Sequence, residues 1–221
     1  MPNYHDMEMR LVYGQTLCEL MAADPRVVCL EADLSKASGT TPAVSGAHPK
    51  NFINVGVAEA DMIGVAAGLA AEGKIPFCAS FTCFASRRAY DQITISVAYA
   101  RNNVKIVGTS PGVTAGANGG THMCFQDLAI MRAMPGMHVY SPCDAAALRA
   151  AMRHLAGNTQ PTYMQLIRSK VAKVFEEGVT FDPNAATVLR EGHDVTLVST
   201  GYATHLAIQA ARTLSERGIR P

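Results

Sequence analysis

A single carboxylate stands at a strand-to-helix turn in the stretch NVGVAEADM, residues 54–62. A short β-branched run ends at Val55, and Glu59 falls in the first turn of a helix predicted over 58–72. Open α/β sheets bind ligands at the carboxyl ends of their strands. Glu59 therefore has two interpretations. It either complements the positive end of the helix, which spacing alone favours, or it is a buried carboxylate that protonates or hydrogen-bonds a ring nitrogen.

Two phenylalanines follow the next predicted strand, in the stretch SFTCFASRRAYDQ, residues 80–92. Phe81 and Phe84 are three residues apart, so they share one face of a helical turn. Such a pair is most often part of a hydrophobic core. Arg87 and Arg88 are unusual neighbours for a core, and they indicate a polar site beside the two rings.

A glycine-rich loop, residues 110–122, lies after the strand predicted over 104–108. Its small residues let the backbone approach a ligand closely. His122 ends the loop and is a candidate acid/base or substrate-contact residue. No Gly-Lys-Ser/Thr follows, which argues against a P-loop, and no G-x-G-x-x-G occurs in a βαβ unit, which argues against a Rossmann dehydrogenase.

The elements that position these stretches alternate between short β-branched runs and longer segments of helical period. Strands are predicted over 26–31, 52–55, 75–80, 104–108, 138–140 and 162–167, and helices over 10–23, 58–72, 88–100, 125–133 and from 144. This order predicts an α/β fold, a parallel sheet with helices on both faces.

The helix predicted over 58–72 has a thin face made of Gly64, Ala67, Gly68 and Ala71. Glycine in a helix interior costs stability, so we expect a closely packed neighbour to compensate. That neighbour belongs either to this chain or to another subunit.

A second unit begins after an irregular connection over 169–193. A strand predicted over 195–200 and a helix over 203–217 are too few elements to bury a core of their own. We therefore expect one domain over residues 1–180 and the start of a second α/β domain over 181–221. On this interpretation the chain is truncated within the second domain.

Composition excludes several classes of protein. Apolar residues make up 48% and charged residues 17%, as in a globular domain. The net charge of +1 gives no reason to expect a nucleic acid or an anionic membrane as partner. No apolar run reaches the length of a membrane span, and residues 1–6 show no signal-peptide pattern. The cysteines form no C-x-x-C pair and are expected to be buried thiols, which makes the cytoplasm the expected location.

Taken together, the three stretches resemble the pyrimidine-binding domain of transketolases. The family's G-[IV]-x-E-x-x-M segment is similar to residues 56–62, and its aromatic pair with R-A-[YF]-[DE]-Q-[IV] is similar to Phe81, Phe84 and residues 88–93. Its glycine loop ending in Thr-His is similar to residues 116–122. The segment from Val195 resembles the start of the family's C-terminal domain.

The resemblance implies thiamine diphosphate as cofactor. Glu59 would bond to N1′ of the aminopyrimidine, which favours the imino tautomer that activates the thiazolium C2. Phe84 would stack on the pyrimidine and Phe81 would line the same pocket. Asp33 and Arg87 are likewise implied to lie at the cofactor.

The resemblance also implies a sugar-phosphate substrate. His122 would contact the transferred two-carbon unit, and Asn118 would contact a substrate hydroxyl. Arg10, Ser38 and Arg168 match positions that bind the sugar's phosphate, where a guanidinium suits an oxyanion. The implied reaction is transfer of a ketol unit from a ketose phosphate to an aldose phosphate.

The family's Gly-Asp-Gly site for Mg²⁺ and diphosphate does not occur in this sequence. No metal ligand is therefore assigned to the chain. We expect an N-terminal transketolase subunit to carry that site, so that the chain is the C-terminal subunit of a split enzyme. The resemblance then implies a heterotetramer with two copies of each subunit.

The glycine loop departs from the family pattern, because Gly-Glu-Asp-Gly is replaced by Gly-Ala-Asn-Gly over 116–119, and a histidine expected near Ser110 is absent. A variant or modified sugar is consistent with these changes. Two alternatives stay open. One is a 1-deoxyxylulose-5-phosphate synthase-like enzyme, whose loop is similar, and the other is a non-catalytic interaction subunit.

Overall fold

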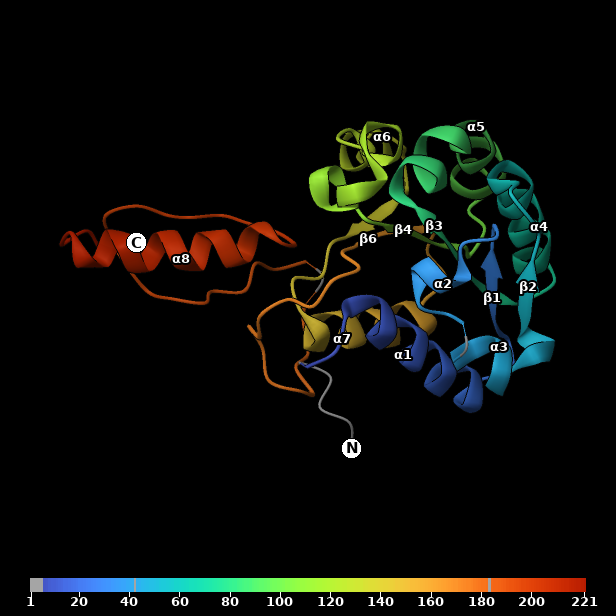
Figure 1. Cartoon of the computed structure of the whole chain (residues 1–221), viewed down its shortest axis with the longest axis horizontal. Helices are drawn as coiled ribbons and strands as arrows, with labels where there is room; N and C mark the ends of the chain where they lie inside the picture. The colour runs from blue at the N-terminus through green and yellow to red at the C-terminus, as the bar shows by residue number, and fades with distance from the viewer. Residues whose placement is uncertain (1–5, 42, 183) are drawn as a thin grey trace.

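A six-stranded parallel sheet organises the chain, with the strand order β2-β1-β3-β4-β6-β5 (Figure 1). The computed structural model describes residues 6–41, 43–182 and 184–221. The strands are β1 (Val27–Glu31), β2 (Phe52–Asn54), β3 (Ile75–Phe81), β4 (Lys105–Thr109), β5 (His138–Tyr140) and β6 (Thr162–Leu166). The parallel sheet confirms the predicted fold class. The first five residues, which show no signal-peptide pattern, lie outside the described residues, as does residue 183 in the connection.

Helices cover both faces of the sheet (Figure 1). The helices of the sheet domain are α1 (Met9–Ala23), α2 (Ser35–Ser38), α3 (Ala43–Ala47), α4 (Glu59–Ala71), α5 (Tyr90–Gln92), α6 (Asp127–Arg132) and α7 (Ala145–Ala156). A further helix, α8 (Ala203–Glu216), projects away from the sheet (Figure 1). The predicted helix start at Asp144 is confirmed, because its carboxylate accepts from the Ala147 N–H at 2.8 Å and caps α7.

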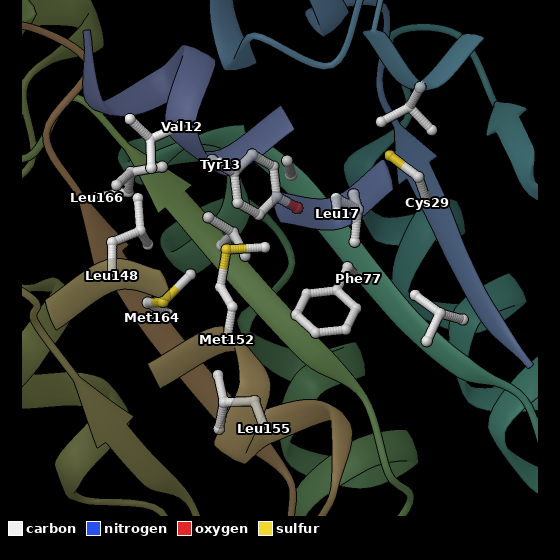
Figure 2. Close-up of a cluster of buried hydrophobic side chains, with 14 of the residues drawn as sticks. Val12, Tyr13, Leu17, Cys29, Phe77, Leu148, Met152, Leu155, Met164 and Leu166 are labelled. Carbon is white, nitrogen blue, oxygen red and sulfur yellow. The ribbon is translucent and has the colours of Figure 1, made fainter. Parts of the chain in front are cut away.

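Alternation along the strands divides the core into two layers. Cys29 and Phe77 face α1 and α7, and Figure 2 shows them with Tyr13, Leu17 and Met152 in this layer. The intervening strand residues turn to the opposite face and pack against α4 and α6. The alternation follows from the two-residue period of a strand, and burial on both faces explains why the strands read as continuous apolar runs.

The register of the sheet brings the chemically important segments to one edge. Phe81, Thr109 and Leu166 are paired across β3, β4 and β6, so the residues that follow these strands lie side by side. Glu31 pairs with Ala79, which places the end of β1 next to the end of β3. The strand order reverses direction between β1 and β3, and such a switch point is where open α/β sheets bind ligands.

The segment predicted as a helix over 88–100 is helical, but most of it is a π-helix and not an α-helix. A π-helical turn spans Phe84–Arg88, α5 follows, and a second π-helical segment spans Ile93–Tyr99. Wider π-helical turns appear as insertions at functional sites. Here the first turn re-aims the side chains that follow Phe84. The apolar pattern predicts a helix here but does not specify its winding.

The prediction of a strand over 195–200 is wrong. These residues form no regular secondary structure, and no strand pairs with them in the described part of the chain. Val198 is 89% exposed, so the apolar pattern is not buried here. A β-branched run needs a hydrogen-bonding neighbour to become a strand. The start of α8 touches the sheet domain through His205 Nε2 and the Cys143 carbonyl oxygen, which are 2.8 Å apart.

The closely packed neighbour expected for α4 is not found among the described residues. Gly64 and Gly68 are exposed, and a Cβ added to either would meet no atom within 4 Å. Ala67, by contrast, is buried against the sheet. Gly64, Gly68 and Ala71 of the thin face therefore point away from the body of this chain, whereas Ala67 packs against it.

The cysteines are free thiols, and all but the half-buried Cys18 are buried, as the sequence predicts. Within the described ranges, no helix combines the length and the apolar character needed to cross a bilayer.

Candidate active site

Glu59 is the first residue of α4, and its carboxylate is 1% exposed. It accepts a hydrogen bond from Ser80 Oγ at 3.2 Å and one from Arg88 Nη1 at 2.8 Å. Both donors lie outside its own helix. The simpler interpretation, in which Glu59 only complements the helix end, does not account for these contacts. The carboxylate instead joins α4, the end of β3 and the π-helical turn.

Arg88 is the site residue that sequence reasoning does not assign. Its guanidinium pairs with Glu59 and also lies 4.2 Å from the centre of the Phe84 ring, in cation–π contact. In the sequence, the indication of such a residue is the pair Arg87 and Arg88 beside the two phenylalanines. Of the two, Arg87 is the one that the resemblance places at the cofactor, but Arg88 makes these contacts in the structure. The π-helical turn decides which arginine faces Glu59, and this winding is not visible in the sequence.

Phe81, Phe84 and His122 form an aromatic cluster. The two phenylalanine rings are 6.1 Å apart, and the His122 ring meets both edge-on, at 5.5 and 5.3 Å. Edge-to-face contacts of this kind are favourable for aromatic pairs. The glycine loop therefore brings His122 next to the phenylalanine pair, as the three sequence stretches together suggest.

Asp33 follows β1 and is exposed at the same edge of the sheet. Its backbone is in the left-handed region, with φ of 62°, which is uncommon for a residue other than glycine. Its N–H donates to Asn54 Oδ1 at 3.0 Å, and the Asn54 amide donates to its carboxylate at 3.3 Å. These bonds hold Asp33 at the ends of β1 and β2.

Arg10, Arg168 and Asn118 lie together. The Arg10 N–H donates to the Arg168 carbonyl oxygen at 3.2 Å, and Arg168 Nη2 donates to Asn118 Oδ1 at 3.2 Å. The Arg168 guanidinium also lies 4.9 Å from the centre of the Phe81 ring. Burial, and then the nearby positive charge of Arg10, lower the pKa of Arg168. The Arg10 guanidinium is itself paired with Glu8, with Nε and Oε2 2.6 Å apart, and its Nη1 donates to the Lys36 carbonyl oxygen at 3.1 Å.

Ser38 is placed differently from the other predicted substrate residues. It is fully buried, and its Oγ donates to Glu31 at 3.3 Å while Thr40 Oγ1 donates to the same carboxyl at 2.7 Å. Its hydroxyl is turned into the protein, toward Glu31, and no hydrogen bond joins it to Arg10 or Arg168 among the described residues. Burial raises the pKa of Glu31 to about 8, and the two hydroxyl donors only partly oppose this rise. Sequence reasoning does not identify Glu31 as a buried acid.

Ser110 follows β4 in the left-handed region, with φ of 58°, and its buried hydroxyl has no hydrogen-bond partner among the described residues. A buried, unpaired hydroxyl is costly. The residue lies at the edge of the sheet shared with Phe81 and Arg168, where a histidine is expected from the family pattern.

A buried polar network supports the end of the glycine loop. Asp127 at the start of α6 accepts from Tyr163 Oη at 2.9 Å and from Gln165 Nε2 at 2.7 Å. Both donors come from β6, so the network ties the loop's exit to the sheet. In the described part of the chain, no group of His, Cys, Asp and Glu side chains is arranged to hold a metal ion.

Comparisons with known proteins identify the family of the chain. The pattern that defines the family "Transketolase, pyrimidine binding domain" matches residues 5–173, and that of "Transketolase, C-terminal domain" matches 184–221. The chain is 50% identical to the 6-deoxy-6-sulfo-D-fructose transketolase subunit SqwH of Clostridium sp. (strain MSTE9), over 96% of this chain and 65% of that protein. It is 36% identical to an apulose-4-phosphate transketolase subunit of Phocaeicola vulgatus, over 96% and 68%. The chain thus spans about two thirds of the length of these relatives.

A solved structure of a split gene transketolase, described as an inactive beta4 tetramer, superposes with a TM-score of 0.88 at 42% identity. The match covers 97% of this chain and 69% of that one. The pyrimidine-binding pattern alone accounts for more than half of the residues here. The chain belongs to the transketolase family.

Proposed function

We propose that the chain is the pyrimidine-binding subunit of a split, thiamine-diphosphate-dependent transketolase that moves a two-carbon ketol unit from a ketose to an aldose. The observation that carries the proposal is the buried Glu59 carboxylate, which Arg88 links to the aromatic cluster of Phe81, Phe84 and His122 at the switch point of the sheet. Its membership of the transketolase family supports the same reaction.

The residues present fit an aminopyrimidine. Such a ring needs a partner for a ring nitrogen and an apolar surface for its faces. Glu59 supplies a buried carboxylate with short polar contacts, and the phenylalanine pair supplies the surface. A buried carboxylate next to aromatic rings has little use in a purely structural core, where burying a charge is costly.

When bound, thiamine diphosphate supplies a carbanion that can accept and release a ketol unit. The chain's own residues hold the pyrimidine end and receive the sugar. Glu59 would bond to the ring nitrogen and Phe84 would stack on the ring, while Asp33 and, as the family resemblance implies, Arg87 would lie on the cofactor side. His122 lies where the transferred unit would react, as a hydrogen-bond donor or acceptor.

The substrate is proposed to be a sugar with an anionic end. Arg168 provides a guanidinium for the anion, Arg10 adds positive charge nearby although it is paired with Glu8, and Asn118 provides an amide for a hydroxyl group. Ser38 contributes to the same end only if its hydroxyl leaves Glu31. The similarity to subunits named for 6-deoxy-6-sulfo-D-fructose and for apulose-4-phosphate supports an anionic sugar, either a sulfonate or a phosphate.

The proposal requires a partner. The chain has no Gly-Asp-Gly segment, so Mg²⁺ and the diphosphate are assigned to an N-terminal transketolase subunit. Exposed apolar side chains at Val57, Ile95 and Tyr99, together with the thin face of α4, offer surface for subunit contacts. We propose a cytoplasmic heterotetramer with two copies of each subunit.

The test is a reconstitution of the chain with its N-terminal partner, thiamine diphosphate and Mg²⁺. Ketol transfer from xylulose 5-phosphate to ribose 5-phosphate, and from a 6-sulfo ketose, is measured for the wild type, for Glu59→Ala and for the exposed control Glu72→Ala. We expect the ketol-transfer activity to fall by roughly 10²–10⁴-fold in Glu59→Ala and to stay unchanged in Glu72→Ala.

Other outcomes separate the alternatives. Activity with pyruvate and glyceraldehyde 3-phosphate in place of ketol transfer would identify a 1-deoxyxylulose-5-phosphate synthase-like enzyme. An assembled complex that binds no thiamine diphosphate would refute the cofactor assignment and leave the non-catalytic subunit as the better description.

A further inference from the structure

Two glutamates are buried on opposite faces of the same edge of the sheet. Glu31 ends β1 and faces the α1 layer, while Glu59 begins α4 on the other face. Their exposed fractions are 0% and 1%, so neither carboxyl group reaches bulk water. Burial without compensation favours the neutral form of a carboxyl group.

The partners of the two carboxyl groups differ in one respect. Glu31 receives hydrogen bonds from the hydroxyls of Ser38 and Thr40, and its pKa is still raised to about 8. Glu59 receives one hydroxyl bond, from Ser80, and one guanidinium bond, from Arg88. The two sites therefore differ in the positive charge of Arg88 and in the position of Glu59 in the first turn of α4, where the helix N-terminus also favours a carboxylate.

We propose that Arg88 is a positioning residue that holds Glu59 in its ionised form, so that both oxygens of this buried carboxylate serve as hydrogen-bond acceptors. Among the described residues, Arg88 is the ion-pair partner of Glu59. Asp61, the nearest acid on the same helix, is exposed, and Ser80 is neutral.

Arg88 is itself held in place for this role. Its guanidinium lies on the Phe84 ring, and the π-helical turn directs it toward α4. The side chain is 48% exposed, so its own charge keeps contact with water and costs little to maintain. Arg87, one residue earlier, is exposed and makes no ion pair with Glu59 among the described contacts.

The consequence, which rests on the proposed function, concerns the proton shared with the cofactor ring. A carboxylate paired with Arg88 has no proton to donate, so the ring nitrogen that bonds to Glu59 must carry it. Binding of such a ring would then take up a proton from solvent. Without Arg88, a neutral Glu59 could donate its own proton.

The inference can be tested without cofactor or partner. The full chain is labelled with ¹³C at the glutamate carboxyl carbons, and the NMR signal of Glu59 is assigned as the one missing from Glu59→Gln. We expect a carboxylate signal for Glu59 at pH 7 in the wild type. In Arg88→Gln, which keeps a polar side chain but removes the charge, we expect a carboxylic-acid signal.

Two further variants separate charge from shape. Arg88→Lys keeps the charge and should keep the carboxylate signal, and Arg87→Met should leave Glu59 unchanged. The Glu31 signal in the same spectra is an internal reference for a buried acid without a cation, and amide spectra establish that each variant is folded. An Arg88→Gln chain with an ionised Glu59, or a wild type with a neutral one, would overturn the proposal. Neither result depends on whether the chain forms a transketolase.

Discussion

Arg168 Nη2 donates to Asn118 Oδ1 at 3.2 Å, and this bond joins the end of β6 to the glycine loop. Asn118 is neutral, so the bond leaves the positive charge of Arg168 uncompensated by its nearest polar contact. The same charge is already disfavoured by burial and by Arg10. An incoming sulfonate or phosphate would relieve this repulsion.

Replacing Asn118 by aspartate should therefore weaken the binding of anionic substrates. The new carboxylate would pair with Arg168 and compete with the anion, at a cost of about 1 kcal/mol, which is roughly a fivefold rise in KM. The reconstituted complex would be assayed with Asn118→Asp and with Asn118→Ala, which removes the contact without adding charge. Equal KM values for the wild type and Asn118→Asp would contradict a role for Arg168 in anion binding.

His122 packs edge-on against both phenylalanines, so its ring has a structural role as well as a proposed chemical one. His122→Phe keeps an aromatic ring of similar shape but removes both nitrogens. We expect ketol transfer to fall by roughly 10²-fold or more while the thermal midpoint stays nearly unchanged. In His122→Ala, we expect both the rate of ketol transfer and the thermal midpoint to fall. If His122→Phe retained full activity, the histidine would serve only to pack the loop.

Glu31 gives the stability of the fold a defined pH dependence. Burial raises its pKa from 4.5 to about 8, so the native state holds a proton that the unfolded chain has released between these values. Its contribution is therefore complete below about pH 4.5 and is lost as the pH rises to about 8. The total change is on the order of several kcal/mol, since one pKa unit corresponds to about 1.4 kcal/mol.

Glu31→Gln should flatten this dependence, because glutamine keeps hydrogen-bonding capacity for Ser38 and Thr40 but does not titrate. Urea unfolding at pH 5, 6, 7 and 8 would compare it with the wild type and with Glu72→Gln, whose side chain is exposed. The variant should gain stability relative to the wild type as the pH rises. Parallel curves for all three proteins would show that Glu31 does not titrate in this range.

Much of the fold can be predicted from the sequence, because the spacing of apolar residues and the length of the apolar runs indicate the helices and strands. β1, β3, β4 and β6 are predicted within a residue or two, since each is buried on both faces and β-branched or apolar through most of its length. The segment 195–200 has the same composition but no partner among the described residues, so composition alone could not distinguish it from a strand. Pairing depends on distant residues that a local pattern does not contain.

The candidate site is predictable in its members but not in its contacts. Glu59, Phe81, Phe84 and His122 can be singled out by type and position, and the structure brings them to one edge of the sheet. The exchange of Arg87 for Arg88 depends on the π-helical turn, which shifts the face on which a side chain appears. The burial of Ser38 against Glu31 depends on how α2 folds back, which spacing does not fix.

Gly108 in β4 tests whether the polar network behind the glycine loop is needed for stability. A Cβ at this position would lie 2.3 Å from Tyr163 Oη, the atom that donates to Asp127. Gly108→Ala should therefore displace the tyrosine, leave Asp127 with one donor fewer and destabilise the fold by about 2–3 kcal/mol. In a Tyr163→Phe background the clashing oxygen is gone, so the same alanine should cost clearly less. Denaturant unfolding of the two single variants and the double variant gives this coupling directly. Additive losses would mean that the backbone of β4, and not the tyrosine hydroxyl, is what excludes a side chain at position 108.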